Sequence, residues 1–203
     1  MSMTAHAAAL PETISFEEFL TVYDGVHAEW VDGKVHLMSP GNERQSALTR
    51  FLGAILQYWA DVHGRVGDTY VAPYTVRTRG NAAREPDVFF VRSENRERVH
   101  GTYVEGPPDL VIEIVSPSSR GTDRGDKYYE YAEAGIPEYW LIDPERKKVE
   151  SYRLGADGGY QLVPLGDPQA LRTEALPGMW IAVEWLWREP LPLLPEVFKD
   201  WAS

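Results

Sequence analysis

The sequence contains no cysteine. Disulfide bonds, a thiol nucleophile, and zinc or iron–sulfur centres held by cysteine are therefore excluded. No apolar run approaches the ~18 residues that a membrane-spanning helix needs. The first residues carry neither a basic segment nor a long apolar stretch, so we expect no signal peptide. A cytoplasmic protein is the simplest expectation.

Basic residues are also in deficit, because 20 lysines and arginines face 31 acidic residues and leave a net charge of −11. Tight non-specific binding of nucleic acid normally needs a basic surface, so the whole-chain charge argues against it. Residues 77–127, however, hold nine basic and nine acidic side chains. A polyanion would meet this neutral stretch more easily than either end. The alternative is a solvated acidic surface that only aids solubility.

Several familiar motifs are missing. The five histidines are scattered without the spacing typical of zinc sites. We find no Walker loop, no GxGxxG dinucleotide-binding pattern and no GxSxG nucleophile elbow. Ser116, before Pro117, is better interpreted as a strand end than as a nucleophile. Zinc chemistry, nucleotide binding by these loops and serine hydrolase chemistry are all poorly supported.

What the chain does contain is typical of a globular protein: 203 residues, with 43% apolar and 25% charged residues. This length fits one domain. We expect a flexible N-terminal arm over 1–14 and a single domain over 15–203. Its C-terminal tail is rich in Trp and Pro and is expected to pack either on the sheet or on a partner chain.

Periodicity and turn signals predict an α/β fold with a mixed central β-sheet flanked by helices. Ser15 is the expected N-cap of the first helix, with Glu18 completing a capping box, and Asp32-Gly33 indicates a hairpin. Gly64 and Gly135 are the expected stops of two later helices. The predicted helices cover 16–23, 44–63 and 122–134, the predicted strands cover 27–40 (the hairpin), 68–79, 87–91, 110–116, 138–144, 147–154 and 158–165, and 92–108 is predicted to be a loop.

Glu113 is the residue that most needs an explanation. It interrupts the apolar strand 110–116, where a buried carboxylate is costly unless it is paired or binds a metal. Alternation places it on one face with Val111 and Val115. Asp87 begins the neighbouring apolar strand, so the two acids can converge. Mg²⁺ prefers such a pair, with water and phosphate oxygens completing its shell. A salt bridge from each acid to an arginine is the alternative.

Lys127 adds a cation to this region. Asp123, Lys127 and Tyr131 recur at helical spacing and so share a face, which Tyr131 indicates is partly buried. A lysine beside two acids can position a water molecule or offset charge that develops on a phosphate. A lysine whose aliphatic stem is buried and whose amine pairs with Asp123 is the alternative.

Three segments resemble a known family. They are Glu85-Pro86-Asp87, PDLVIEIVSPSS (108–119) and DRGDKYYEYAEAGIPEYWLIDP (123–144), and HAEWVDGKVHLMSP (27–40) resembles the family's N-terminal hairpin. The family is Uma-two, a group of proposed endonucleases in the PD-(D/E)XK restriction-endonuclease-like superfamily. The resemblance covers roughly residues 15–185. The run from 108 to 144 is specific, whereas the Pro-Asp dipeptide alone is not.

The resemblance implies a site built on Asp87 and Glu113 as ligands of Mg²⁺ or Mn²⁺. The superfamily's usual lysine position holds Val115, and Lys127 matches a lysine moved to the next helix. Gln45 matches a family position near the site. Arg120 and Arg124 would flank the site and hold the phosphate backbone. Three positions stay open: Glu29 is site-adjacent or structural, Arg44 stands where the family often has histidine, and Glu43 could reach the metal instead.

The implied activity is Mg²⁺-dependent hydrolysis of DNA phosphodiester bonds by an endonuclease with catalytic residues Asp87, Glu113 and Lys127. We expect a homodimer, which would suit cleavage of both strands, and an additional protein partner could help this acidic chain find DNA. Two alternatives stay open. One is a catalytically inactive nucleic-acid-binding or assembly module with the same fold. The other is a small-molecule hydrolase with a pocket too narrow for a duplex.

Overall fold

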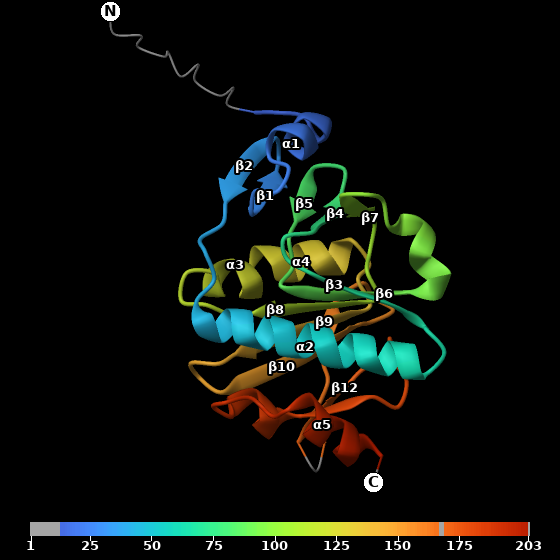
Figure 1. Cartoon of the computed structure of the whole chain (residues 1–203). Helices are drawn as coiled ribbons and strands as arrows, with labels where there is room; N and C mark the ends of the chain where they lie inside the picture. The colour runs from blue at the N-terminus through green and yellow to red at the C-terminus, as the bar shows by residue number, and fades with distance from the viewer. Residues whose placement is uncertain (1–12, 167–168, 203) are drawn as a thin grey trace, which may run out of the picture.

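A six-stranded mixed sheet forms the centre of the computed structural model, which describes residues 13–166 and 169–202. The strand order is β11-β10-β9-β8-β6-β3, and only β8 and β9 run parallel. Figure 1 shows this sheet between helices. Its strands are β3 (Gly67–Val71), β6 (Val88–Arg92), β8 (Leu110–Ile114), β9 (Glu138–Asp143), β10 (Lys148–Leu154) and β11 (Tyr160–Leu162). The predicted mixed central sheet is confirmed.

Strand β8 lies inside the sheet and is buried on both faces. Leu110, Ile112 and Ile114 pack with α2 (Glu43–Val62), which lies across one face. Val111 and Val115 pack on the other face with Tyr131 of α4 (Asp126–Glu133). The predicted division of this strand into two faces is therefore confirmed, and Glu113 lies on the α4 side.

A second sheet of five strands, in the order β2-β1-β5-β4-β7, lies at the end of the molecule where α1 (Phe16–Val22) packs (Figure 1). Ser15 caps α1, since Glu18 N donates to Ser15 Oγ at 3.2 Å and the Glu18 carboxylate accepts from Ser15 N at 2.8 Å. The strands are β1 (Ala28–Val31), β2 (Lys34–Leu37), β4 (Thr75–Arg79), β5 (Ala82–Arg84) and β7 (Tyr103–Glu105). The predicted capping box and N-terminal hairpin are both confirmed.

The backbone geometry of the hairpin turn explains why Asp32 and Gly33 occupy it. Asp32 and Gly33 have φ of 51° and 82°, and a turn with two positive φ values matches the twist of paired strands. A Cβ on Gly33 would lie 2.9 Å from Thr13 Cβ. Glycine is therefore required at this position both for the φ value and for the close approach of Thr13.

The C-terminal segment packs on the chain's own core. It comprises β12 (Ala170–Arg172), β13 (Trp180–Ala182), the 3₁₀ helix η2 (Val183–Trp187) and α5 (Leu194–Trp201). Leu171, Ile181, Trp185 and Val197 are buried with the core-facing residues of α2. The tail was expected to pack either on the sheet or on a partner chain, and in the structure it packs on the chain itself. No helix in the described part of the chain is long and apolar enough to cross a membrane.

Three predicted elements differ in the structure. The single strand over 68–79 is two strands, β3 and β4, in different sheets, and Pro73 between them has no N–H for a ladder. The loop over 92–108 contains the 3₁₀ helix η1 (Ser93–Arg98) and β7. The helix over 122–134 is divided into α3 (Arg120–Arg124) and α4 at Gly125, where a Cβ would lie 2.7 Å from Gly121 O.

One further strand before the C-terminal segment was not predicted, and the expected flexible arm does not extend to residue 14. Strand β5 was not predicted, because its three residues are too short for a pattern to register. Residues 1–12 of the expected flexible arm lie outside the described residues. Ile14, which belongs to the same expected arm, is tied to the hairpin: its N–H donates to Gly33 O at 2.8 Å, and its carbonyl accepts from Trp30 Nε1 at 2.9 Å.

Candidate active site

A cleft of about 870 Å³ lies among the β1–β2 hairpin, the start of α2, the end of β8 and the α3–α4 helices. Its lining is strongly acidic. Three basic side chains, Arg79, Arg84 and Lys127, line it together with two histidines, His27 and His36. The acidic side chains that line it are Glu29, Asp32, Glu85, Asp87, Glu113, Asp123, Asp126 and Glu130. The cleft therefore attracts cations.

Asp87 stands immediately before β6 and is held by two hydrogen bonds. Its Oδ2 accepts from the backbone N–H of Ile114, on the neighbouring β8, at 2.7 Å. Its Oδ1 accepts from Gln45 Nε2 at 2.9 Å. Gln45 is in the first turn of α2, where Asn42 caps the helix by accepting from Gln45 N at 2.8 Å. The structure thus brings Gln45 and Asp87 together as the resemblance implied.

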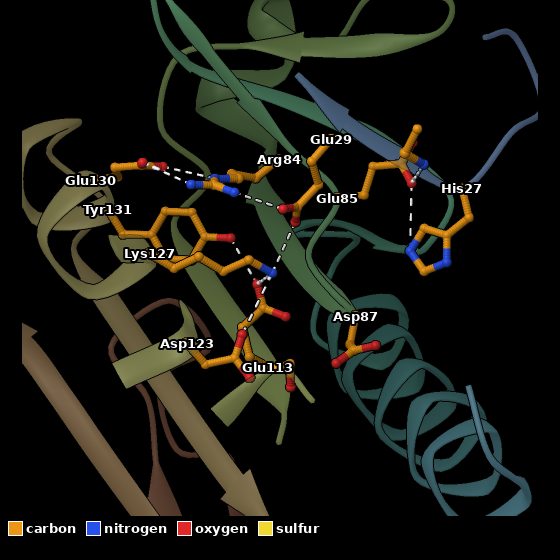
Figure 2. Close-up of polar contacts among 12 residues, drawn as sticks. His27, Glu29, Arg84, Glu85, Asp87, Glu113, Asp123, Lys127, Glu130 and Tyr131 are labelled. Carbon is orange, nitrogen blue, oxygen red and sulfur yellow. Dashed lines mark hydrogen bonds and ion pairs between the residues drawn. The ribbon is translucent and has the colours of Figure 1, made fainter. Parts of the chain in front are cut away.

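Glu113 lies on β8 and faces α4. Its Oε1 accepts from Lys127 Nζ at 2.9 Å and from Tyr131 Oη at 2.7 Å, while Oε2 accepts no hydrogen bond from the described residues. Lys127 also lies 2.9 Å from Glu29 Oε1 and 3.6 Å from Asp123 Oδ1. Figure 2 shows this amine among the three carboxylates. Asp123, Lys127 and Tyr131 do converge, although Asp123 is on α3 and the other two are on α4, and Asp123 is one of three partners of the amine rather than the sole one.

Glu29, for which the sequence left open a site-adjacent or a structural role, contacts two cations. Besides Lys127 it contacts Arg84, whose Nη1 donates to Glu29 Oε2 at 2.7 Å. Arg84 is held from the other side by both oxygens of Glu130, each at 2.8 Å. Sequence reasoning missed Arg84 and Glu130. Glu130 carried a signal, because it lies three residues after Lys127 on the same helix.

His27 and Glu85 were also missed. His27 Nε2 lies 3.5 Å from Glu85 Oε2, and the same oxygen accepts from Ala28 N at 3.1 Å. Glu85 is adjacent to Pro86 in the segment that carries the family resemblance, which was the available signal. The pairing itself joins residues 57 positions apart for Ala28 and Glu85, so no local pattern could reveal it.

Burial sets the charge states in the cleft. It raises the pKa of Asp87 to about 6, aided by the negative charge of Glu113, and it raises the pKa of Glu113 as well. Burial also opposes charge on Lys127, but Glu113, Glu29 and Asp123 outweigh it and hold the pKa of the amine well above its ordinary value. Lys127 therefore stays protonated at neutral pH.

The predicted phosphate-contacting arginines are directed elsewhere. Arg120 pairs with Glu145 at 3.1 Å and Asp143 at 3.5 Å. Arg124 pairs with Glu150 at 2.8 Å and Asp143 at 3.6 Å. Neither arginine lines the cleft. The structure therefore does not bring the two arginines together with Asp87 and Glu113.

Two other open positions are also placed away from the site. Glu43 is exposed and does not line the cleft, so it does not replace Gln45 as a candidate near the metal ligands. Arg44 donates to the carbonyl oxygens of Leu186 and Arg188 at 2.6 and 3.0 Å. Arg44 therefore ties α2 to the C-terminal segment.

The chemistry of the cleft fits Mg²⁺ or Mn²⁺. No group of three or more His, Asp or Glu side chains in the described ranges is arranged to hold a metal ion. Mg²⁺ does not require one, because it binds through one or two carboxylates and keeps several waters or phosphate oxygens. Among the described residues, no donor binds Glu113 Oε2, and Asp123 Oδ1 is buried without a hydrogen bond. These oxygens, in a cleft with excess negative charge, suit a hard divalent cation.

Comparison with solved structures finds the same fold in the crystal structure of "a putative nuclease belonging to DUF820" from Anabaena variabilis. The TM-score is 0.69 at 19% sequence identity, and the match covers 86% of this chain and 97% of that one. Among curated proteins, "Uncharacterized protein slr1290" of Synechocystis sp. (strain PCC 6803) is 25% identical over 191 residues, 92% of this chain and 98% of the relative.

A family model described as "Putative restriction endonuclease" matches residues 16–184. The match spans the hairpin, both sheets, the acidic cleft and the helices that carry Gln45 and Lys127. It agrees with the resemblance found in the three sequence segments. The chain belongs to the Uma2 family.

Proposed function

We propose that the protein is a Mg²⁺-dependent endonuclease that hydrolyses phosphodiester bonds of DNA. One observation carries the proposal: the buried carboxylates of Asp87, immediately before β6, and of Glu113, on the neighbouring β8, share a cleft with a lysine bound to Glu113 at 2.9 Å. Membership of a restriction-endonuclease family supports the same chemistry.

Asp87 and Glu113 would hold the metal ion, with Mn²⁺ able to replace Mg²⁺. When bound, the ion supplies Lewis acidity that activates water and offsets charge on the phosphate. Gln45 and the Ile114 N–H orient Asp87 through its two oxygens. Lys127 and Tyr131 bind the same oxygen of Glu113, which leaves its other oxygen available to the ion.

Lys127 supplies a fixed positive charge rather than a base. Because its pKa is held above the ordinary range, it cannot accept a proton at neutral pH. It can instead orient the attacking water and stabilise the negative charge that builds up on the phosphate. Asp87, Glu113 and Lys127 are therefore the proposed catalytic residues.

A homodimer is part of the proposal, because cutting both strands of a duplex suits two copies of one site related by twofold symmetry. The tryptophans of the C-terminal segment do not carry this argument, since they pack on the chain's own core. Light scattering at micromolar concentration tests it. A mass near 23.0 kDa would exclude the dimer.

Cleavage of supercoiled plasmid at low salt tests the function. Wild type should cut with Mg²⁺ or Mn²⁺ and not with EDTA, and Glu113→Gln should lose at least about 100-fold in rate because the ligand charge is removed. Glu133→Gln is the matched control, because Glu133 is 66% exposed and lies outside the cleft. Folded wild type that binds Mg²⁺ but cuts nothing would favour the inactive binding module.

A further inference from the structure

The basic side chains that line the cleft differ in how many carboxylates already pair with them. Arg84 and Lys127 are each held by two or more carboxylates, and Arg79 pairs with Glu130 and Glu133. His27 is different. Its side chain is 35% exposed, Nε2 is directed at Glu85, and Nδ1 has no hydrogen bond within the described residues. Nε2 of His27 thus lies near a carboxyl group, while the partly exposed ring lines the cleft with Nδ1 unpaired among the described residues.

Glu85 is a rigid anchor for this ring. Its side chain is 5% exposed, and its oxygens accept from Ala28 N at 3.1 Å and Thr75 Oγ1 at 3.4 Å. When Glu85 is ionised, its carboxylate favours a proton on the nearby Nε2 and leaves Nδ1 without a partner among the described residues. The contact with Glu85 thus favours one orientation of the His27 ring and one position for its proton.

Glu85 also keeps His27 in the same cleft as the proposed metal ligand Asp87. Glu85 and Asp87 are separated only by Pro86, and both line the cleft. In Figure 2 His27 lies on the Asp87 side of the group, whereas Lys127 lies on the Glu113 side. The two nitrogen groups thus stand on different sides of the carboxylate pair, as an attacking water and a leaving oxygen would.

We propose that His27 is the general acid that protonates the leaving sugar oxygen, with Glu85 as its positioning residue. The proposal rests on the proposed nuclease function. Water adds to phosphorus and releases a proton to solvent, and the phosphorus–oxygen bond to the leaving group breaks with its electron pair on oxygen. That oxygen takes the proton from Nδ1 of the imidazolium form of His27, which leaves the neutral Nε2–H ring, and bulk water then returns a proton to Nδ1.

His36 offers the matched comparison. It lines the same cleft, and its register position on β2 is opposite Glu29 of β1. It is exposed and has no carboxylate partner within 4.0 Å in the described part of the chain. A histidine that merely adds positive charge to the cleft would act equally from either position, whereas a positioned acid acts only from His27.

Leaving-group dependence tests the proposal, because 4-nitrophenolate departs at neutral pH without a proton and a DNA sugar oxygen does not. His27→Ala should lower the rate of DNA cleavage by about 100-fold, the lower end for lost general acid catalysis. Its rate on bis(4-nitrophenyl) phosphate should change less than about twofold. Glu85→Gln should lower DNA cleavage about 10-fold with the same substrate split, and His36→Ala should match wild type.

A second measurement is independent of activity. In metal-free protein, ¹⁵N–¹H correlation spectra of the imidazoles should show that the neutral form of His27, the form left after Nδ1 has donated, carries its proton on Nε2, and Glu85→Gln should lose that preference. Thermal melting should show that His27→Ala folds, as expected for a side chain that is partly exposed.

Three results would overturn the proposal. His27→Ala that cuts DNA at the wild-type rate, or that loses both substrates equally, excludes a proton-donor role while leaving the nuclease intact. A His27 spectrum unaffected by Glu85→Gln removes the positioning role. Wild type that cleaves neither substrate with any metal refutes the nuclease function and the proton donor with it.

Discussion

Lys127 Nζ lies 2.9 Å from Glu113 Oε1, although the two residues are 14 positions apart and on different elements. The position two residues after Glu113, on the same face of β8, holds Val115, which is buried in the core. A helix that packs on this face therefore supplies the cation that the strand does not. The amine reaches the carboxylate from α4, with Tyr131 beside it on the same helix.

Lys127→Met should abolish cleavage and also weaken the fold. Removing the amine leaves Glu29, Glu113 and Asp123 as close buried carboxylates, and breaking a buried ion pair costs about 3–5 kcal/mol. Denaturation in EDTA at pH 8 measures this loss, and part of it should be recovered at pH 5.5 as the acids take up protons. Lys148→Met, at an exposed pair, should change neither property. Undiminished cleavage by the Lys127 variant would exclude the catalytic role.

Asp87→Asn should weaken Mg²⁺ binding at least about 10-fold, because one of two charged ligands becomes neutral. Isothermal titration calorimetry without DNA measures this directly. Asp32→Asn is the control, since Asp32 lines the cleft and its positive φ is one that asparagine accepts. Equal weakening in both variants would indicate a general effect of charge in the cleft rather than a specific ligand.

Without metal, the protein should gain stability as the pH falls from about 7 to about 4. Burial raises the pKa of Glu85 to about 7 and that of Asp87 to about 6, above their values in an unfolded chain, so the folded state binds protons more tightly. Asp87 alone contributes up to about 3 kcal/mol. Glu29, whose pKa is lowered because Lys127 and Arg84 outweigh its burial, acts in the opposite direction at lower pH.

Chemical denaturation in EDTA at pH 5.5 and pH 8 measures this dependence. Asp87→Asn should flatten it, because the substituted amide does not titrate. An unchanged pH dependence in the variant would show that Asp87 is not among the groups whose protonation is linked to folding.

Arg84 and Arg79 both pair with Glu130 but differ in burial, so their removal should change stability by different amounts. Arg84 is 6% exposed and joins Glu29 to Glu130, whereas Arg79 is 32% exposed and reaches Glu130 at 3.7 Å. Arg84→Met should lower the free energy of unfolding by about 3–5 kcal/mol, because it leaves the buried carboxylates of Glu29 and Glu130 without this cation. Arg79→Met should cost about 1 kcal/mol or less. Equal losses would mean that Arg84 is no more buried in solution than Arg79.

Arg124→Ala should leave DNA cleavage within about threefold of wild type, because its guanidinium is bound to Glu150 and Asp143 rather than directed into the cleft. The slope of DNA affinity against salt should also be unchanged, since each lost phosphate contact lowers it by about one. A shallower slope would restore the phosphate-binding role that the sequence suggested for this residue.

Local sequence patterns are enough to predict the central strand and the faces on which its neighbouring side chains lie. Alternation alone predicts that Glu113 shares a face with Val111 and Val115, and helical spacing alone places Lys127 with Tyr131, because both follow from the repeat of the backbone. Asp87, immediately before β6, lies near Glu113 because β6 pairs with β8, a pairing that the sequence order favours but does not dictate. The same logic fails at short elements: three-residue β5 shows no period, and the run 68–79 alternates although it belongs to two sheets.

Which charged side chains pair depends on the packing of distant segments. Glu29 meets Arg84, and His27 meets Glu85, because β1 pairs with β5 more than 50 residues along the chain. Arg120 and Arg124 are close to Lys127 in sequence, yet they turn to Asp143 and Glu150. Long side chains bind whichever opposite charge packing brings near, since a buried charge without a partner is too costly to keep. Strand pairing and burial select that partner, and neither is written in local sequence.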